Sequence, residues 1–392
     1  MKQFNTVLLL ALSVALIGCA DKPKAIGEDL IPPGDTFAES TVTAYSDTTY
    51  RTPIVNGYSA STLVGKLPTG EEYITLLDFY PISIADSLKG AKIDTAEIRL
   101  TVNYRLLPAS PPITLNVYEL LQSFSEGTFT SDTLPSSMIG TVIGKVSVGT
   151  FSDSMKYSQR IIARIDTNVA RRWADDFLDT SKPDFHGFVI RMLTSSGVIG
   201  FTPFNLLSGV IPSLVIKYTK NGKLDSLTFT SGQDTYVGIY SSPPSFADVE
   251  VRGGVGVRSK LKFDISSFRG NPIVARSVLT LTVDTTLSTY SGYTQDSLVA
   301  VLALPGPNID SSNTVYFAYG TKKSTAGSSP IYDFPITEIS QRWINNLSVN
   351  EGVTIRWVAE NSSGDRIVFF PNTAPDSTKR PKLKILYSEM TR

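Results

Sequence analysis

The chain is almost free of thiol and imidazole groups. Its 392 residues include one cysteine, Cys19, and one histidine, His186. No disulfide can form within the chain, and most routes to nucleophilic catalysis or to a zinc site are closed. The fold must therefore be stabilised by a large packed core.

An excess of charge is also missing. The chain has 36 Lys and Arg residues against 36 Asp and Glu residues, which gives a formal net charge of zero. Proteins that bind nucleic acid usually present a strongly basic surface to the phosphates. The composition therefore gives no reason to expect a nucleic-acid partner.

The one pronounced apolar run lies near the N-terminus. Lys2 supplies a positive charge, residues 7–17 are mostly apolar, and the run is too short to span a bilayer. This pattern predicts a signal peptide over residues 1–18. The residues that end it, Leu16-Ile-Gly-Cys19, resemble the lipobox of bacterial lipoproteins, which implies a diacylglycerol on the Cys19 sulfur. The alternative is an ordinary cleaved signal with an incidental cysteine.

A polar segment follows, and residues 19–40 are predicted to form a lipid-anchored flexible tether. Pro23, Pro32, Pro33 and Gly34 oppose helix formation there. Ala20 stands where an inner-membrane retention signal often has Asp, so the resemblance to sorted lipoproteins implies the outer membrane. The periplasmic and surface faces remain alternatives.

The rest of the chain is interpreted as two copies of one plan. Alternating apolar residues mark a strand in each copy, and an Arg-Trp pair follows in each at Trp173 and Trp343. Five segments of the first copy match five of the second. In chain order, 77–79 matches 261–263, 95–102 matches 276–283, 169–173 matches 339–343, 187–191 matches 352–356, and 212–218 matches 381–387. Their order is the same throughout, which indicates an internal duplication.

These segments predict an all-β fold. Short alternating strands are separated by Gly, Pro, Asn and Ser clusters, as in antiparallel sandwiches. We expect two tandem, jelly-roll-like β-sandwich domains at 41–219 and 226–388. One short helix is expected in each, because apolar residues recur every four positions at Val169, Trp173 and Phe177 and again at Ile339, Trp343 and Leu347.

The order of segments in each copy resembles the DNRLRE domain, a bacterial extracellular β-sandwich often found in tandem. The resemblance covers most of residues 41–388 and rests on the helical Arg-Trp turn, the Gly-x-x-Ile-Arg strand and the final Pro-x-Leu-x-Ile-x-Tyr strand. The tryptophans that the family usually has before the helix have no counterpart at 124–129 or 313–319. Their absence weakens the expectation of a sugar site there.

Trp173 and Trp343 are predicted to be structural, because their helical spacing turns them toward the core. Sugar stacking is the alternative for both rings. The adjacent Arg172 and Arg342 are expected in structural ion pairs. His186 aligns with Glu351 of the second copy, so the shared plan does not require an imidazole.

Tyrosines in Gly, Ser or Thr surroundings are the candidate ligand-binding residues, because an amphipathic ring can stack on a glycan and hydrogen-bond to it. Strand formation alone is the competing explanation. The candidates are Tyr50, Tyr58, Tyr236, Tyr240, Tyr290, Tyr293, Tyr316 and Tyr319.

Together these patterns predict a non-catalytic lipoprotein of the cell envelope. Its two modules would bind glycan or another envelope component, and the membrane would be contacted through lipid on Cys19. One alternative is a structural scaffold in a surface assembly, and another is a lipid-anchored polysaccharide hydrolase or lyase. No cofactor or metal motif is present, although jelly rolls often hold a structural calcium through scattered oxygens.

Overall fold

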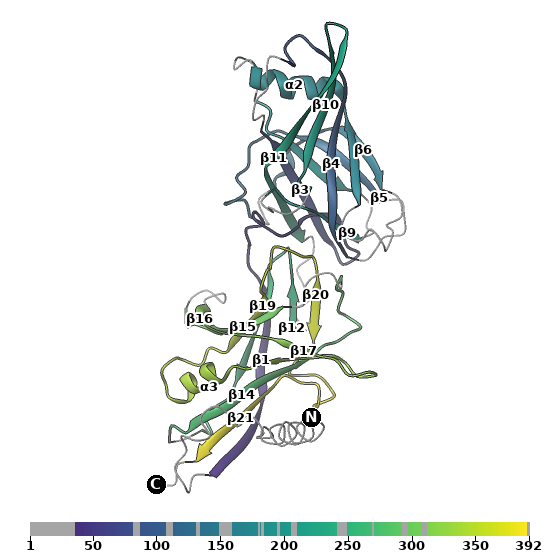
Figure 1. Ribbon diagram of the computed structural model, residues 1–392. Helices are drawn as coiled ribbons and strands as arrows, with labels where there is room; N and C mark the ends of the chain where they lie inside the picture. The colour runs from purple at the N-terminus through teal and green to yellow at the C-terminus, as the bar shows by residue number, and fades with distance from the viewer. Residues whose placement is uncertain are drawn as a thin grey trace, which may run out of the picture.

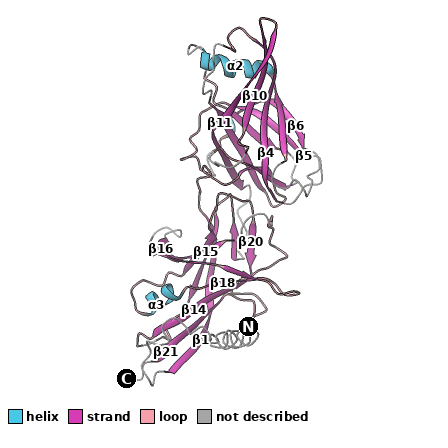
Figure 2. Ribbon diagram, viewed as in Figure 1, coloured by secondary structure: helices cyan, strands magenta, loops and turns pink. Residues whose placement is uncertain are grey.

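The computed structural model describes residues 36–80, 87–106, 113–130, 134–148, 159–178, 181, 184–193, 197–204, 210–240, 249–268, 270–291, 297–306 and 312–389 (Figure 1). The predicted all-β, antiparallel class is confirmed, with two short α-helices in the described part. Figure 2 shows how little of the molecule they occupy. None of the helices in this part is long and apolar enough to cross a membrane.

Ten strands form one sheet, the ten-stranded sheet. They are β2 (Thr62–Lys66), β3 (Glu71–Phe79), β4 (Lys92–Leu106), β5 (Ile113–Leu120), β6 (Ile139–Val148), β7 (Arg160–Ile165), β8 (Phe188–Met192), β9 (Gly197–Phe201), β10 (Ser213–Lys220) and β11 (Lys223–Tyr240). Additional pairings of β10 with β4 and of β3 with β8 fold the sheet back on itself in a sandwich-like arrangement. The short helix η2 (Ser136–Met138) precedes β6, and α2 (Thr167–Leu178) lies at one end (Figure 1).

The other strands form the eleven-stranded sheet. They are β1 (Thr36–Arg51), β12 (Val249–Arg252), β13 (Val257–Phe263), β14 (Ile273–Thr282), β15 (Leu298–Ala303), β16 (Ser312–Tyr319), β17 (Thr321–Lys323), β18 (Ile331–Phe334), β19 (Val353–Trp357), β20 (Arg366–Phe369) and β21 (Lys382–Glu389). Helix α3 (Thr337–Ile344) packs on β14. Each sheet has its own apolar core, one around Trp173 and one around Trp343.

The first strand of each copy pairs in the sheet built mainly from the other copy. β1 lies between β13 and β21, and β11 lies between β3 and β10. The two strands occupy equivalent places. Ala44 of β1 pairs with Phe263 of β13, Ser231 of β11 pairs with Phe79 of β3, and a register shift follows directly after Ala44 and after Ser231. The predicted ranges 41–219 and 226–388 follow sequence similarity, whereas strand pairing exchanges β1 and β11.

A tight turn explains this exchange. Asn221 and Gly222 link β10 to β11, and both have positive φ, at 52° and 76°. Asn-Gly with this backbone forms a two-residue hairpin, and Lys220 pairs with Lys223 across it. The hairpin holds β11 beside β10, which leaves β1 to complete the eleven-stranded sheet.

β1 begins at Thr36, which pairs with Glu389 of β21. The last residues of the predicted tether, 36–40, therefore lie in a strand. They become ordered because β21 supplies backbone partners for them.

Candidate functional site

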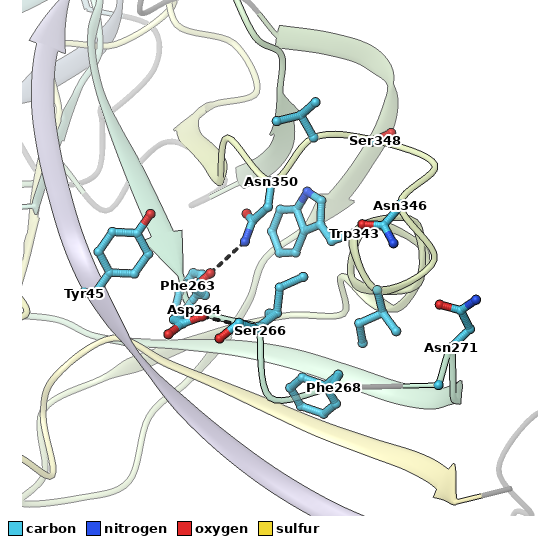
Figure 3. A pocket seen from close by; sticks show the side chains of 14 residues that line it. Tyr45, Phe263, Asp264, Ser266, Phe268, Asn271, Trp343, Asn346, Ser348 and Asn350 are labelled. Atoms are coloured by element: carbon cyan, nitrogen blue, oxygen red, sulfur yellow. Dashed lines mark hydrogen bonds between the residues drawn. The ribbon is translucent and has the colours of Figure 1, made fainter.

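A hollow of about 940 Å³ opens in the eleven-stranded sheet beside α3 (Figure 3). It is bordered by β1, by the end of β13 with the loop after it, and by α3 with the loop that follows. Its lining residues are Tyr45, Phe263, Asp264, Ile265, Ser266, Phe268, Gly270, Asn271, Trp343, Ile344, Asn346, Ser348, Val349 and Asn350. We refer to it as the α3 hollow.

The floor of the α3 hollow is apolar and its rim is polar. Phe263 and Trp343 are buried, with 3% of Trp343 exposed, whereas Tyr45 on the rim is 58% exposed. Asn350 is held in place, because its Nδ2 donates to the Phe263 carbonyl at 2.7 Å and its Oδ1 accepts from the Gly352 N–H at 3.2 Å. This combination of an apolar floor and an amide rim suits a neutral hydroxylated ligand.

Asp264 is the one charged residue among those that line the α3 hollow. Its carboxylate accepts a hydrogen bond from the Ser266 N–H at 3.0 Å (Figure 3). Hydrogen bonds from the Ser266 backbone and hydroxyl hold the pKa of this carboxyl below its ordinary value. Glycoside hydrolysis usually needs a pair of carboxyl groups, and the lining supplies one.

The equivalent place in the ten-stranded sheet is filled. The register makes Gly232 the counterpart of Tyr45 and Tyr80 the counterpart of Asp264. The Tyr80 ring lies against Gly232 so closely that a Cβ there would overlap it, and its hydroxyl accepts a hydrogen bond from Gln233 Nε2. In this sheet a tyrosine ring therefore covers the bulge, whereas in the other sheet the bulge residue is itself a tyrosine, Tyr45.

The tryptophan of α2, Trp173, is also more closely packed than Trp343 of α3. Trp173 packs edge-on against Phe177 and Phe229, with ring centroids 5.3 and 4.8 Å away. The positions equivalent to these phenylalanines hold Leu347, which is exposed, and Val42. Smaller or outward-turned side chains thus leave space beside Trp343. The α3 hollow arises where the eleven-stranded sheet departs from the ten-stranded sheet.

The predicted ligand-binding tyrosines do not gather at this hollow. Tyr50 and Tyr236 are buried, so their rings cannot stack on an external ligand. The remaining described candidates are Tyr58, Tyr290 and Tyr319, which are exposed, and Tyr240 and Tyr316, which are half-buried. Tyr293 and the predicted lipidation site Cys19 lie outside the described residues.

The predicted structural residues occupy buried or bonded positions. Trp173 is fully buried, and Arg172 forms a bidentate ion pair with Glu119 at 2.7 and 2.8 Å. Arg342 lies over the Tyr316 ring, 4.0 Å from its centroid, and donates to the Tyr316 hydroxyl at 2.9 Å. Among the described residues, Arg342 therefore has the aromatic residue Tyr316 as a partner, and the expected ion pair is not the contact that Arg342 makes.

Trp343 has two roles. It belongs to the core of the eleven-stranded sheet, and it also lines the α3 hollow. The helical spacing predicts the first role but gives no information about the second.

His186 is half-buried. The described residues contain no group of three or more His, Cys, Asp or Glu side chains arranged to hold a metal ion. Comparison with protein-family models and with curated protein sequences gives no match.

Tyr45 is the rim residue that the sequence interpretation missed. It lies in β1, which the sequence places partly in a tether, and its counterpart Gly232 has no side chain. An alignment of the two copies that included the first strands would have marked this tyrosine as a departure from the shared plan. The pairing of β1 with β13 brings it to the hollow.

Proposed function

We propose that the protein is a non-catalytic lipoprotein of the outer membrane that binds a glycan in the α3 hollow. The lipobox-like Leu16 to Cys19 segment supports the anchor. The resemblance to the DNRLRE domain supports two tandem modules presented at the cell envelope. The observation that carries the binding function is the α3 hollow, with its apolar floor, amide rim and exposed Tyr45.

The chemistry of the hollow matches that of a pyranose. One face of such a ring is apolar and can stack on the exposed ring of Tyr45, while hydroxyl groups need donors and acceptors at the edge. The amide side chains of Asn271 and Asn346 supply both kinds of group. The volume of about 940 Å³ lies at the upper end of the usual range for ligand pockets. It leaves room for more than one sugar ring.

A structural role in a surface assembly is the second candidate, and one observation favours it. β16 is an edge strand of the eleven-stranded sheet, and alternate residues Val315, Phe317 and Tyr319 on it are exposed. An exposed apolar edge strand can accept a strand from another protein. Cross-linking in intact cells that recovered only monomer would count against this role.

The glycan function is tested by affinity electrophoresis of the mature protein on a panel of neutral polysaccharides. We expect retention on at least one, and Tyr45→Ala should weaken it about tenfold because the stacking ring is lost. Tyr319→Ala is the matched control, because its ring is equally exposed but lies outside the α3 hollow. Lack of retention on every polysaccharide, or equal losses for both variants, would refute the site.

The anchor is tested by Cys19→Ala. This variant lacks the thiol to which the diacylglycerol is transferred, so it should accumulate as an unprocessed precursor without acyl label. Metabolic labelling with a radioactive fatty acid measures this outcome. Normal labelling of the variant would contradict the lipoprotein assignment.

A further inference from the structure

A smaller hollow lies next to the α3 hollow and shares Tyr45 with it. Its volume is about 390 Å³, and its lining residues are Tyr45, Ser46, Thr48, Lys260 and Lys262. Ser46 pairs with Lys262, and Thr48 pairs with Lys260, across β1 and β13. Because side chains alternate along strands, these four residues project from one face of the sheet. The two hollows therefore meet at Tyr45.

The charges at the smaller hollow are not balanced. Glu351 Oε2 lies 2.8 Å from Lys262 Nζ and 3.8 Å from Lys260 Nζ, so one carboxylate is shared by two ammonium groups. The Lys260 side chain is only 10% exposed, and its burial lowers the pKa of its ammonium group. A further anion between the two lysines would complete the charge pairing.

Two other charged groups on or directly after β13 already have hydrogen-bond partners. Farther along β13, Arg258 forms a bidentate ion pair with Glu360 at 2.6 and 2.7 Å. Toward the α3 hollow, Asp264 accepts the hydrogen bond from the Ser266 N–H. Neither carboxylate appears among the ion pairs of the two lysines in the described part of the chain. The shared Glu351 is thus their counterion.

The lysine pair is a second departure from the shared plan. In the ten-stranded sheet, the equivalent positions of β3 hold Leu76, which is fully buried, and Asp78. Both the open α3 hollow and the lysines are therefore confined to the eleven-stranded sheet. They lie on either side of the same exposed ring, Tyr45.

From this arrangement we propose that the two hollows form one extended site for a glycan that carries an anionic substituent. The neutral part of the glycan lies in the α3 hollow and stacks on Tyr45. Its carboxylate or phosphate lies between Lys260 and Lys262. This inference rests on the proposed glycan function and specifies the class of glycan.

The lysines suit either kind of anion. An ammonium group is a compact point charge with three donors, which does not impose the planar geometry of an arginine fork. A charge-assisted hydrogen bond is stronger where water is partly excluded, as it is around Lys260. A uronic acid and a phosphorylated sugar are therefore both acceptable ligands, and experiment can separate them.

Isothermal titration calorimetry of the full chain in detergent micelles tests this proposal. The carboxylate probe is tetragalacturonate, and its methyl ester is the neutral comparator. The phosphate probe is a mannose oligosaccharide that bears a 6-phosphate, compared with the unphosphorylated oligosaccharide. The variant is Lys260→Met with Lys262→Met. Lys384→Met is its control, because Lys384 forms an exposed pair with Glu39 in the same sheet at 2.7 Å.

We expect at least one anionic probe to bind about tenfold or more tightly than its neutral comparator. This preference should disappear in the double variant and persist in Lys384→Met. If the preference is seen with the carboxylate probe, the anion is a carboxylate. If it is seen with the phosphate probe, the anion is a phosphate. Lys262→Met alone, at a more exposed position, should lose part of the preference and provides the test if the double variant unfolds.

Two other outcomes would overturn the proposal. Equal binding of charged and neutral probes, unchanged in the double variant, would refute the anionic subsite and leave the glycan function standing. Failure of all four probes to bind would also refute it. In that case, retention of the mature protein on neutral polysaccharides decides whether the glycan function survives.

Discussion

Single tyrosines decide which sheet has an open hollow. In the ten-stranded sheet, the Tyr80 ring lies over Gly232, whereas in the eleven-stranded sheet the bulge residue itself is Tyr45 and Asp264 replaces Tyr80. One tyrosine ring thus covers the bulge in the ten-stranded sheet, and another forms the exposed rim of the α3 hollow in the eleven-stranded sheet. Duplication followed by a few such exchanges can confine a binding site to one of the two sheets without changing the strands.

Asp78, the counterpart of Lys262, gives a pH-dependent prediction. Burial raises the pKa of its carboxyl from 3.8 to about 6. Because the folded state favours the protonated form, its contribution to stability is greatest below pH 4 and is lost as the pH rises through 6. Asp78→Asn should therefore raise the free energy of unfolding at pH 8, by up to about 3 kcal/mol, and change it little at pH 4.

Urea denaturation at the two pH values measures this effect. Asp376→Asn is the control, because hydrogen bonds from Thr378 lower the pKa of that exposed carboxyl. Its removal should not stabilise the protein at pH 8. A loss of stability in Asp78→Asn at pH 8 would show that the ionised carboxylate is favourable where it lies.

At the scale of single residues, periodicity predicts burial better than it predicts binding. Helical spacing places Trp173 and Trp343 on inward faces, and both are buried. Which tyrosines share a surface depends on strand register, which the sequence does not reveal. Tyr50 and Tyr236 illustrate this, because both lie in strands and both side chains are buried, so neither is available to a ligand.

At the scale of elements, period-two alternation and helical spacing are enough to predict the strands of the matched segments and both helices. They do not predict which sheet each first strand joins. β1 and β11 carry the same bulge and the same register, so either could pair beside β3 or β13. The Asn221-Gly222 turn decides between them. It is a strong hairpin signal in the sequence, and it lies between the two predicted domain ranges, 41–219 and 226–388.

At the scale of the whole molecule, the exchanged strands are accompanied by buried polar contacts between the sheets. Arg252 of β12 pairs with Glu71 of β3, and both side chains are almost completely buried. The Tyr104 hydroxyl donates to Asp365 Oδ1 at 2.7 Å, and the Tyr236 hydroxyl donates to the Asn361 carbonyl at 2.8 Å. A buried ion pair is costly to break, so these contacts oppose separation of the sheets.

The exchange determines which fragments of the chain can fold. A fragment of residues 52–240 contains every strand of the ten-stranded sheet, whereas residues 41–219 include most of β1 but lack β11. Without β11, β3 and β10 lose a shared neighbour and Trp173 loses its contact with Phe229. We expect 52–240 to unfold in one cooperative urea transition and 41–219 to show none.

Fluorescence of Trp173, the one tryptophan in either fragment, measures both outcomes. The fragment 52–240 lacks Val255 and Val257, which are buried in one apolar cluster with Leu63 and Tyr104. Loss of this cover favours aggregation of the fragment, so complementation provides an independent test. A peptide of residues 223–240 added to 41–219 should restore a cooperative transition, because β11 then pairs with β3 and β10. A peptide of residues 36–51 is the matched control, since β1 has the same register but lacks Phe229, which packs on Trp173. Equal rescue by both peptides would show that register alone determines the partner, whereas cooperative folding of 41–219 by itself would show that β11 is dispensable.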